Sequence, residues 1–573
     1  MKRVLYLAAL TLALGACEEK TDTPDGSFNN RDLVLQSDIM TPEVLWSFGR
    51  LSEVALSPDG STVVYGVTYT NISENKSYTD LYTVPAKGGE VKQITNTKFN
   101  EAQPGWRPDG QKITFLSSES GSMQLWEMNI DGSARKQITD VEGGISAYLY
   151  SPDMKQLAYI KAVKLDQTVN DLYPDLPLAN ARIEDDLMYR HWDSWHDYTY
   201  NHLFIAPYSE GSLITSGKDI MEGERFDSPL KPFGGMEQIA WSPDSKSIVY
   251  TCKKLVGRDY AFSTNSDLYL YNIETGLTEN LTEGMMGYDQ NPVFSPDGSK
   301  LIWESMERDG YEADKNRLFL MDMASREKKD LTASFDHNIA SPVWDREKPY
   351  IWFVSNVSAT EQIHAIDLQT GEITKVTEGM QDFVQVLNAG DILIAVRMSI
   401  SSPSEIYSID LASGTATNIS NINTPVLSQL TLGDVEERWV KTTDGKDMLV
   451  WVIYPPHFDP SKKYPAILYC QGGPQDGVSQ FWSLRWNFQM MAANGYVVIA
   501  PNRRGLPGFG TEWNEQISGD YGGQNMKDYL SAVDALSKEP FIDETRLGAV
   551  GASYGGFSVY WLAGNHNKRF KAF

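Results

Sequence analysis

Residues 295–303 read Ser-Pro-Asp-Gly-Ser-Lys-Leu-Ile-Trp, and close copies of this stretch, about 50 residues apart, decide the fold. Proline sets φ for a turn, aspartate can bond to the backbone ahead of it, and glycine takes the left-handed position. Each copy therefore predicts a tight turn that leads into a strand. The turns begin at Ser57, Arg107, Ser151, Ser242 and Ser295.

Each unit continues with a second, alternating strand, such as Asp267–Tyr271, and closes with an apolar residue and a threonine, such as Leu281-Thr282. A single small sheet of this kind cannot bury both faces, so the copies stack radially as blades. With degenerate units near Trp344 and Asn388, the sequence predicts an all-β propeller of seven blades over residues 37–430.

One interval departs from the regular spacing. The turns at Ser151 and Ser242 are 91 residues apart, and only one opening turn is visible between them. We favour one blade with a long insertion. Two blades in this interval, and eight in total, are the alternative.

Composition excludes several classes of protein. The 573 residues include 76 acidic and 50 basic side chains, a net charge of −26, so nucleic acid is not an expected partner. Three cysteines (Cys17, Cys252, Cys470) cannot form a disulfide framework and lack zinc-like spacing. His191, His196 and His202, with Asp193 and Asp197, are interleaved with aromatic residues and lack a typical ligand pair, so we expect no metal and no cofactor.

The N-terminus has the pattern of an exported lipoprotein. Residues 1–16 begin Met-Lys-Arg, continue with a 13-residue apolar run and end in Leu-Gly-Ala directly before Cys17. The run is too short to span a bilayer and fits a signal peptide, and the small residues before the cysteine resemble a bacterial lipobox. We expect lipid on Cys17 to anchor the protein on the periplasmic or cell-surface side, with residues 17–36 as a flexible tether. The alternative is a plain signal peptide with a chance cysteine.

The pattern changes after about residue 430. Tyr464–Cys470 and Tyr496–Ala500 are short apolar runs typical of buried strands, and residues 525–538 carry one apolar helical stripe. Alternation of strands and helices predicts a parallel sheet in residues 431–573. Together with the Gly-x-Ser-x-Gly motif at residues 551–555, this predicts an α/β-hydrolase domain.

The sequence Gly551-Ala-Ser553-Tyr-Gly555 follows the predicted strand Leu547–Val550. This is the G-x-S-x-G pattern of a nucleophile elbow, in which Ser553 is exposed at a tight strand-to-helix turn. Side chains in place of Gly551 and Gly555 would collide with neighbouring backbone. We therefore predict Ser553 as the catalytic nucleophile.

A second glycine-rich loop, Gln471-Gly-Gly-Pro474, follows another buried strand. Acyl transfer develops negative charge on a carbonyl oxygen, which two backbone N–H groups can stabilise. The predicted donors are the N–H groups of Gly473 and Tyr554. The alternative is a turn that merely reverses the chain.

The lipobox, the propeller, Gly472-Gly473-Pro474, the loop Asn502–Gly510 and the elbow together resemble the prolyl oligopeptidase family of serine peptidases. Residues 186–193 and the 502–510 loop are most similar to the acylaminoacyl-peptidase and dipeptidyl-peptidase 5 branch. The resemblance implies cleavage of short peptides, because the propeller covers the active site. Gln471 departs from the His or Tyr usual in relatives, which puts in doubt a side-chain contribution to the oxyanion hole.

In this fold an aspartate and then a histidine follow the nucleophile. Only twenty residues follow Ser553, and we see no strand after the elbow helix. We therefore expect the sequence to be a fragment lacking roughly a hundred residues and inactive by itself. His566 would point away from Ser553 and is interpreted as a surface residue.

Two groups of charged residues are candidates for substrate binding. Glu184, Asp185, Asp186 and Asp193 could pair with the α-ammonium of a peptide, and the alternative for the first three is a solvated acidic helix start. Arg503 and Arg504 could hold substrate carbonyls or brace acidic neighbours such as Asp520.

The leading hypothesis is a lipid-anchored serine exopeptidase that releases dipeptides from short peptides. An acylaminoacyl-peptidase or an esterase on the same scaffold is one alternative. A catalytically dead peptide-binding propeller protein is another.

Overall fold

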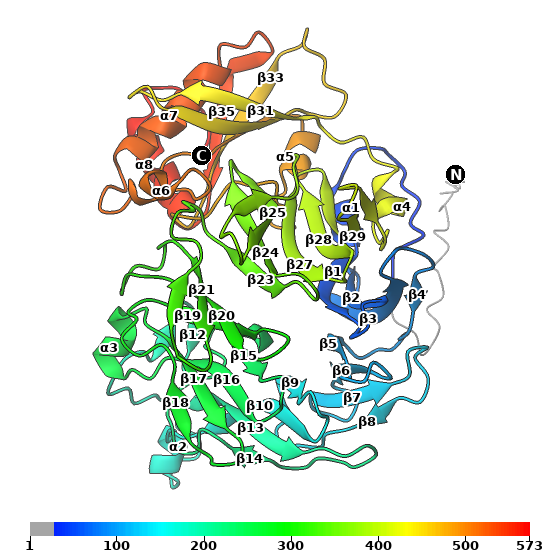
Figure 1. Ribbon diagram of the computed structural model, residues 1–573. Coiled ribbons are helices and arrows are strands. Elements are labelled where there is room, and N and C mark those ends of the chain that lie inside the picture. Colours follow the sequence, from blue (N-terminus) through cyan, green and yellow to red (C-terminus); the bar gives the residue numbers. More distant parts are fainter. Residues whose placement is uncertain (1–27) are drawn as a thin grey trace, which may run out of the picture.

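The protein was analysed as a computed structural model that describes residues 28–573. The predicted signal segment 1–16, Cys17 and the first part of the tether lie outside the described residues. Seven four-stranded sheets form a ring, and a mixed α/β domain lies against one side of it (Figure 1). The predicted seven-bladed propeller followed by a hydrolase-type domain is confirmed.

Each blade is a sheet of four antiparallel strands taken in chain order. Blades 1 and 2 consist of β1 (Arg50–Leu56), β2 (Thr62–Asn71), β3 (Lys76–Pro85) and β4 (Lys92–Gln93), and of β5 (Glu101–Trp106), β6 (Ile113–Ser117), β7 (Gln124–Met128) and β8 (Lys136–Gln137). Blade 3 consists of β9 (Ala147–Tyr150), β10 (Gln156–Lys164), β13 (Thr199–Pro207) and β14 (Lys218–Asp219). Blade 4 consists of β15 (Ile239–Trp241), β16 (Ser247–Cys252), β17 (Asp267–Asn272) and β18 (Thr278–Asn280).

Blades 5 to 7 complete the ring. Their strands are β19 (Asp289–Phe294), β20 (Lys300–Ser305), β21 (Arg317–Asp322) and β22 (Lys328–Asp330); β23 (Ala340–Trp344), β24 (Tyr350–Val357), β25 (Thr360–Asp367) and β26 (Ile373–Lys375); β27 (Asp382–Asn388), β28 (Ile392–Ser399), β29 (Ser402–Asp410) and β30 (Ala416–Asn418).

The repeated residues make the contacts that hold each blade. In blade 1 the Ser57 hydroxyl donates to Asp59 Oδ1 (2.6 Å) and accepts from the N–H of Thr62 (2.9 Å), which closes the turn between the first two strands. The closing threonine ties down the third strand, because the N–H of Leu81 donates to Thr95 Oγ1 (2.8 Å). The same threonine contact recurs in blades 2, 4, 5 and 6.

Neighbouring blades pack through their apolar faces. At three junctions a tryptophan Nε1 also donates to a carbonyl in the first strand of the preceding blade: Trp106 to Ala55 (3.2 Å), Trp241 to Leu149 (3.1 Å) and Trp344 to Val293 (3.1 Å). The ring closes by packing rather than strand exchange, because blade 7 meets blade 1 in one apolar cluster that contains Tyr65 and Ile394.

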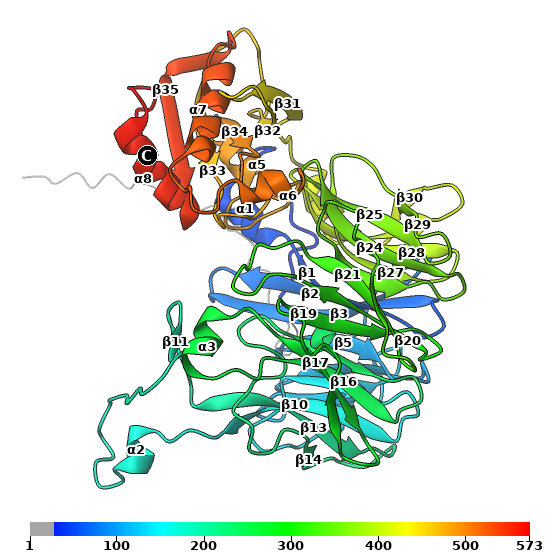
Figure 2. The same ribbon diagram turned by 60° about the vertical axis from the view of Figure 1, so that its left-hand side comes forward.

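The 91-residue interval contains one blade with an insertion, so the alternative of eight blades is wrong. The insertion joins β10 to β13 and carries α2 (Val169–Leu172) and the hairpin β11 (Arg190–His191) and β12 (Ser194–Trp195). No helix begins at Glu184, so the alternative of an acidic helix start is also wrong. Figure 2 shows this arm extending away from the ring.

The hydrolase domain is built on a five-stranded sheet in the order β31-β32-β34-β33-β35. Its strands are β31 (Val435–Lys441), β32 (Asp447–Ile453), β33 (Tyr464–Cys470), β34 (Val497–Pro501) and β35 (Ile542–Gly551), and its helices are α5 (Phe488–Ala493), α6 (Thr511–Glu515), α7 (Gln524–Leu536) and α8 (Tyr554–Asn565). The last three strands are parallel, as predicted, and the first two are antiparallel additions at one edge.

Within the described residues no further strand follows α8, as expected, but residues 571–572 pair briefly with β35. Ala572 forms a parallel bridge with Gly548 on β35, the N–H of Lys571 donates to Leu547 O (2.8 Å), and the N–H of Ala549 donates to Ala572 O (3.1 Å). The sequence pattern missed this pairing because the extended segment is too short to show alternation.

The short helices outside the two main units are α1 (Pro42–Ser47), α3 (Gly257–Phe262), α4 (Thr424–Leu427) and the 3₁₀ helix η1 (Met236–Gln238). The segment that contains α1 bridges the domains, because Asp38 accepts from Thr431 Oγ1 (2.7 Å) and pairs with His457 (2.8 Å). Among residues 28–573, no helix is long and apolar enough to cross a bilayer.

The hydrolase domain contacts blades 5, 6 and 7. Tyr311 in blade 5 accepts from Gln475 Nε2 (2.7 Å), the N–H of Ser358 in blade 6 donates to Gly508 O (2.8 Å), and Asp382 in blade 7 accepts from Ser479 Oγ (2.6 Å). Tyr311 and Ser358 lie in connections between second and third strands. The insertion is the same connection in blade 3, so it leaves the ring on the face that carries the hydrolase domain.

Two carboxyl groups lie close together at this interface. The N–H of Glu361 donates to Asp382 Oδ1 (2.9 Å), and Glu361 Oε1 accepts from Asn356 Nδ2 (2.6 Å). Burial, together with the charge of Asp382, raises the pKa of Glu361 to about 7, and burial raises the pKa of Asp382 to about 6. The interface therefore favours protonated carboxyl groups.

Replacing Glu361 by glutamine tests whether burial raises the pKa of this carboxyl group in the folded protein. The unfolded chain releases the Glu361 proton near pH 4.5 and the folded chain near pH 7, so wild-type stability falls across that window. Glu361→Gln, which can still accept from Asn356, should raise the free energy of unfolding by about 3 kcal/mol at pH 8 and by nothing at pH 4. Denaturant unfolding at both pH values measures the difference. An equal gain at both pH values would contradict the assignment.

Candidate active site

Ser553 lies at the turn between β35 and α8. Its backbone has φ 55° and ψ −125°, a left-handed conformation that non-glycine residues adopt at a cost of about 1–3 kcal/mol. The residue is exposed, whereas Tyr554 and Gly555 directly after it are buried. The strained turn therefore holds the serine at the surface of the domain.

Both glycines of the elbow lie against the carbonyl oxygen of Cys470 at the end of β33, and Gly551 also lies against the backbone of Gly555. A methyl group on Gly551 would lie 2.7 Å from this oxygen, and one on Gly555 would overlap it. The predicted collisions are therefore found at both positions. They arise because β33 and β35 pair in parallel with Cys470 opposite Gly551.

The glycine-rich loop after β33 lies beside the serine. A methyl group on Gly472 would lie 3.7 Å from Cβ of Ser553, and Gly473 has φ +103°. Tyr554 is the first residue of α8, so its N–H has no partner within the helix. The structure thus brings together Ser553 and the loop that contains Gly473. Their roles as nucleophile and oxyanion donors stay predictions.

The same loop places the site at the junction of the two domains. Gln475 donates through Nε2 to Tyr311 of the propeller (2.7 Å) and to Asn514 O of the hydrolase domain (2.9 Å). Gln471 is buried: its Oε1 accepts from Tyr469 (2.6 Å), and its Nε2 donates to Asp476 (3.0 Å). Both ends of the Gln471 side-chain amide, which departs from the family pattern, are therefore occupied by hydrogen bonds to nearby residues.

Neither predicted arginine is placed to bind substrate. Arg504 is 3% exposed and bonds through its guanidinium to Asp528 (3.1 Å) and Asp444 (2.5 Å). Its hydrogen bonds hold the pKa of Asp444 well below the usual range. Arg503 is 0% exposed. The alternative of bracing acidic neighbours holds for Arg504 alone, and those neighbours are Asp444 and Asp528 rather than Asp520.

The four acidic candidates lie in the blade 3 insertion. Glu184 pairs with Arg182 (2.8 Å), Asp186 accepts from the N–H of Leu187 (2.9 Å), and Asp185 and Asp193 are exposed. Among the described residues, no hydrogen bond or ion pair joins any of the four to the hydrolase domain. They share the face of the ring that carries this domain, and their role in amine binding stays a prediction.

Two histidines considered in the sequence analysis, His202 and His566, form hydrogen bonds within the fold. His202 bonds to Asp219 Oδ2 and to Glu224 O, both at 2.8 Å. His566 follows the last residue of α8, about 18 Å along the helix from Ser553, and its Nδ1 accepts from the N–H of Phe570 (3.0 Å). Within residues 28–573, no three His, Cys, Asp or Glu side chains gather in a way that could hold a metal ion.

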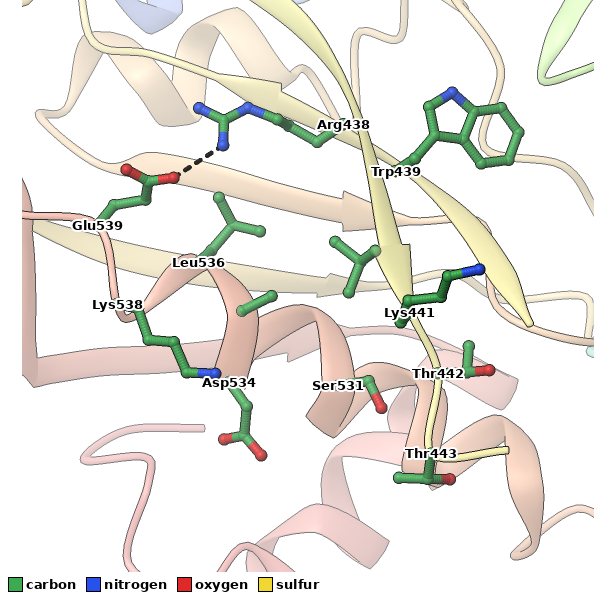
Figure 3. A pocket seen from close by; sticks show the side chains of 12 residues that line it. Arg438, Trp439, Lys441, Thr442, Thr443, Ser531, Asp534, Leu536, Lys538 and Glu539 are labelled. Carbon is green, nitrogen blue, oxygen red and sulfur yellow. Dashed lines mark hydrogen bonds and ion pairs between the residues drawn. The ribbon is translucent and has the colours of Figure 1, made fainter. Parts of the chain in front are cut away.

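A pocket of about 510 Å³ lies between β31 and α7, with Arg438 and Glu539 paired across its upper part (Figure 3). Its lining includes Trp439, Lys441 and Asp534 but none of the residues predicted for catalysis or substrate binding. The pocket is therefore separate from the site around Ser553.

Comparison with known families matches both parts of the chain. Residues 38–176 and 237–427 match the TolB β-propeller domain, and residues 482–573 match the prolyl oligopeptidase family. Dipeptidyl-peptidase 5 from Porphyromonas gingivalis is 52% identical over 534 residues, covering 93% of this chain and 78% of the relative.

The chain belongs to the prolyl oligopeptidase family. It is thus a serine peptidase, and the resemblance noted in the sequence is confirmed. Dipeptidyl-peptidase 5 from Porphyromonas endodontalis is 48% identical and covers the whole chain and 82% of the relative. Among solved structures, an acylaminoacyl peptidase in complex with a chloromethyl ketone matches with a TM-score of 0.76 at 20% identity, over 93% of this chain and 78% of the other. That match shows a shared fold.

The sequence pointed to Asn502 and Arg503 but not to their contacts with the loop 471–478 of this prolyl oligopeptidase family member. Asn502 donates through Nδ2 to Val478 O (3.0 Å) and accepts from the Val478 N–H (3.2 Å). Arg503 donates to Pro474 O (3.0 Å). The available signal was the position of both residues directly after β34, the strand that neighbours β33 in the sheet.

The close fit of the elbow around Cys470 O can be tested with two glycines of α8. Gly555→Ala should lower the free energy of unfolding by about 3 kcal/mol and abolish labelling of Ser553 by a fluorophosphonate, because the new methyl group meets backbone that cannot yield. Gly564→Ala is the matched control, since a methyl group there meets nothing within 4 Å. It should add up to about 1 kcal/mol of stability through helix propensity. Equal behaviour of the two variants would refute this description of the elbow.

Proposed function

We propose that this serine peptidase releases dipeptides from the N-termini of short peptides, with Ser553 as its nucleophile. The observation that carries the proposal is the strained, exposed Ser553 beside the Gly472-Gly473 loop, at the junction with the propeller. The dipeptide unit is supported by two relatives, about half identical over most of their length, that are named dipeptidyl-peptidase 5.

In the proposed reaction Ser553 Oγ attacks the carbonyl carbon of the scissile bond. Electrons move to the carbonyl oxygen, and the N–H groups of Gly473 and Tyr554 stabilise the charge that develops there. As the intermediate collapses, the C–N bond breaks and the proton lost by the Ser553 hydroxyl passes to the leaving nitrogen, so the shortened peptide departs as an amine and the dipeptide remains as an ester on Ser553. Water then hydrolyses this acyl-enzyme.

Release of a fixed two-residue unit requires recognition of the free α-ammonium group. The candidates are Glu184, Asp185, Asp186 and Asp193 in the insertion, which stands on the hydrolase face of the ring. A charge pair of this kind contributes little when exposed and more when substrate binding removes water. Conversion of each of these residues to its amide should raise KM if it contacts the amine.

The intact enzyme should cleave a dipeptidyl reporter with a free N-terminus at least tenfold faster, in kcat/KM, than the N-acetylated form of the same reporter. Acetylation removes the charge that sets the register of the substrate. The measurement is release of the fluorescent leaving group, with Ser553→Ala as the inactive control. Preference for the acetylated reporter would replace this proposal with an acylaminoacyl-peptidase. Undiminished turnover by Ser553→Ala would remove Ser553 from the mechanism.

We also propose that the protein is exported and anchored to a bacterial membrane by lipid on Cys17, on the basis of the lipobox-like sequence alone. Cys17→Ser should move the protein from the membrane fraction to the soluble fraction when it is expressed in a bacterium that processes lipoproteins. Metabolic labelling with a fatty-acid analogue measures the modification directly. Unchanged fractionation and an absence of label in the wild type would rule out the anchor.

A further inference from the structure

Arg503 is a buried cation that has no anionic partner among the described residues. Its side chain is 0% exposed, and no carboxylate of residues 28–573 forms an ion pair with it. All its hydrogen bonds go to neutral acceptors: Nε donates to the Tyr529 hydroxyl (3.0 Å), and Nη1 donates to Arg504 O (2.7 Å). Buried charges are normally paired, so an unpaired one needs a reason.

The remaining hydrogen bonds of Arg503 reach the glycine-rich loop. Nη2 donates to Pro474 O (3.0 Å) and to Gln471 O (3.4 Å), the carbonyl groups on either side of Gly472 and Gly473. Nε and Nη1 of the same planar group are held by Tyr529 and Arg504 O, which fixes the direction of Nη2 in a way that the flexible ammonium of a lysine cannot reproduce. The peptide planes that flank the predicted oxyanion donor Gly473 are therefore fixed by one side chain.

The same guanidinium also contacts the other half of the predicted oxyanion hole. Its central carbon lies 4.8 Å from the centre of the Tyr554 ring, and Tyr554 supplies the second N–H. Arg503 thus touches both donor segments, although they are about 80 residues apart in sequence. No carboxylate of the described residues pairs with it, so its positive charge acts on both donor segments, whose N–H groups would face the negative oxygen that acyl transfer develops.

We propose that Arg503 is a positioning residue of the oxyanion hole, which holds the Gly472-Gly473 loop against Tyr554 and places a buried positive charge behind both. The inference rests on the proposed function, since it assumes acyl transfer at Ser553. It requires only that a tetrahedral oxyanion forms, whichever acyl group the enzyme prefers.

The test compares variants of the intact enzyme on whichever reporter the wild type cleaves best. Arg503→Met removes the charge and the fork while keeping the length of the side chain. It should lower kcat about 100-fold and change KM by less than about threefold, because only the transition state carries the oxyanion charge. Arg503→Lys, which keeps the charge without the fork, should lie between Arg503→Met and the wild type.

A second readout separates positioning from general loss of structure. A peptidyl boronate binds to the serine as an anionic tetrahedral adduct, whereas the free dipeptide product binds without one. For Arg503→Met, boronate affinity should fall by the same factor as kcat/KM, and product affinity should stay unchanged. The matched control is Arg504→Lys: Arg504 is equally buried but pairs with Asp444 and Asp528, so this variant should lose thermal stability with little change in kcat.

The proposal is overturned if Arg503→Met loses no more kcat than Arg504→Lys at a temperature where both are folded, or if its boronate affinity is unchanged. If Arg503→Met does not fold, Tyr529→Phe provides the test, because it removes only the hydroxyl group that accepts from Arg503 Nε. A parallel fall in kcat and boronate affinity would support the proposal, and unchanged values would overturn it. Failure of the proposed function is distinguished by Ser553→Ala, which would then retain turnover.

Discussion

The carbonyl oxygen of Cys470 is the atom on which the arrangement of the site depends. It ends β33, and the parallel register with β35 brings it so close to the elbow that only glycine fits at positions 551 and 555. The chain continues from Cys470 directly into the Gly472-Gly473 loop, so the elbow and the loop cannot shift independently. Strain at Ser553 persists because packing on both sides fixes the backbone.

The propeller adds a second set of constraints to this loop. The ring closes by packing of blade 7 on blade 1, and blades 5 to 7 support the hydrolase domain through contacts such as Gln475 with Tyr311. Glu361 and Asp382 lie at the same interface, on blades 6 and 7, and burial raises the pKa of both carboxyl groups toward neutrality. The propeller therefore contacts the loop beside Ser553 directly.

Two adjacent arginines show how tertiary surroundings divide residues that look equivalent. Arg503 and Arg504 follow the same strand and are both buried. Two carboxylates of the hydrolase domain neutralise Arg504, so we expect its replacement to change the stability of the fold. Within residues 28–573 Arg503 has only carbonyl and phenol acceptors, beside the predicted oxyanion hole, which is the basis for the role we propose for its charge.

The sequence by itself determined the blades and the elbow, because both depend on local rules. A turn of the Ser295–Gly298 type requires proline and glycine at fixed positions, and Gly551 and Gly555 are forced by backbone contacts that any nucleophile elbow makes. Tertiary structure alone decided the partners of Arg503 and Arg504, the short pairing of Ala572 with Gly548, and the blades that carry the hydrolase domain. These contacts join residues far apart in the chain, and sequence periodicity carries no information about which distant surfaces meet. A buried arginine and a substrate-binding arginine have the same letter in the sequence, and only the groups packed around each one distinguish them.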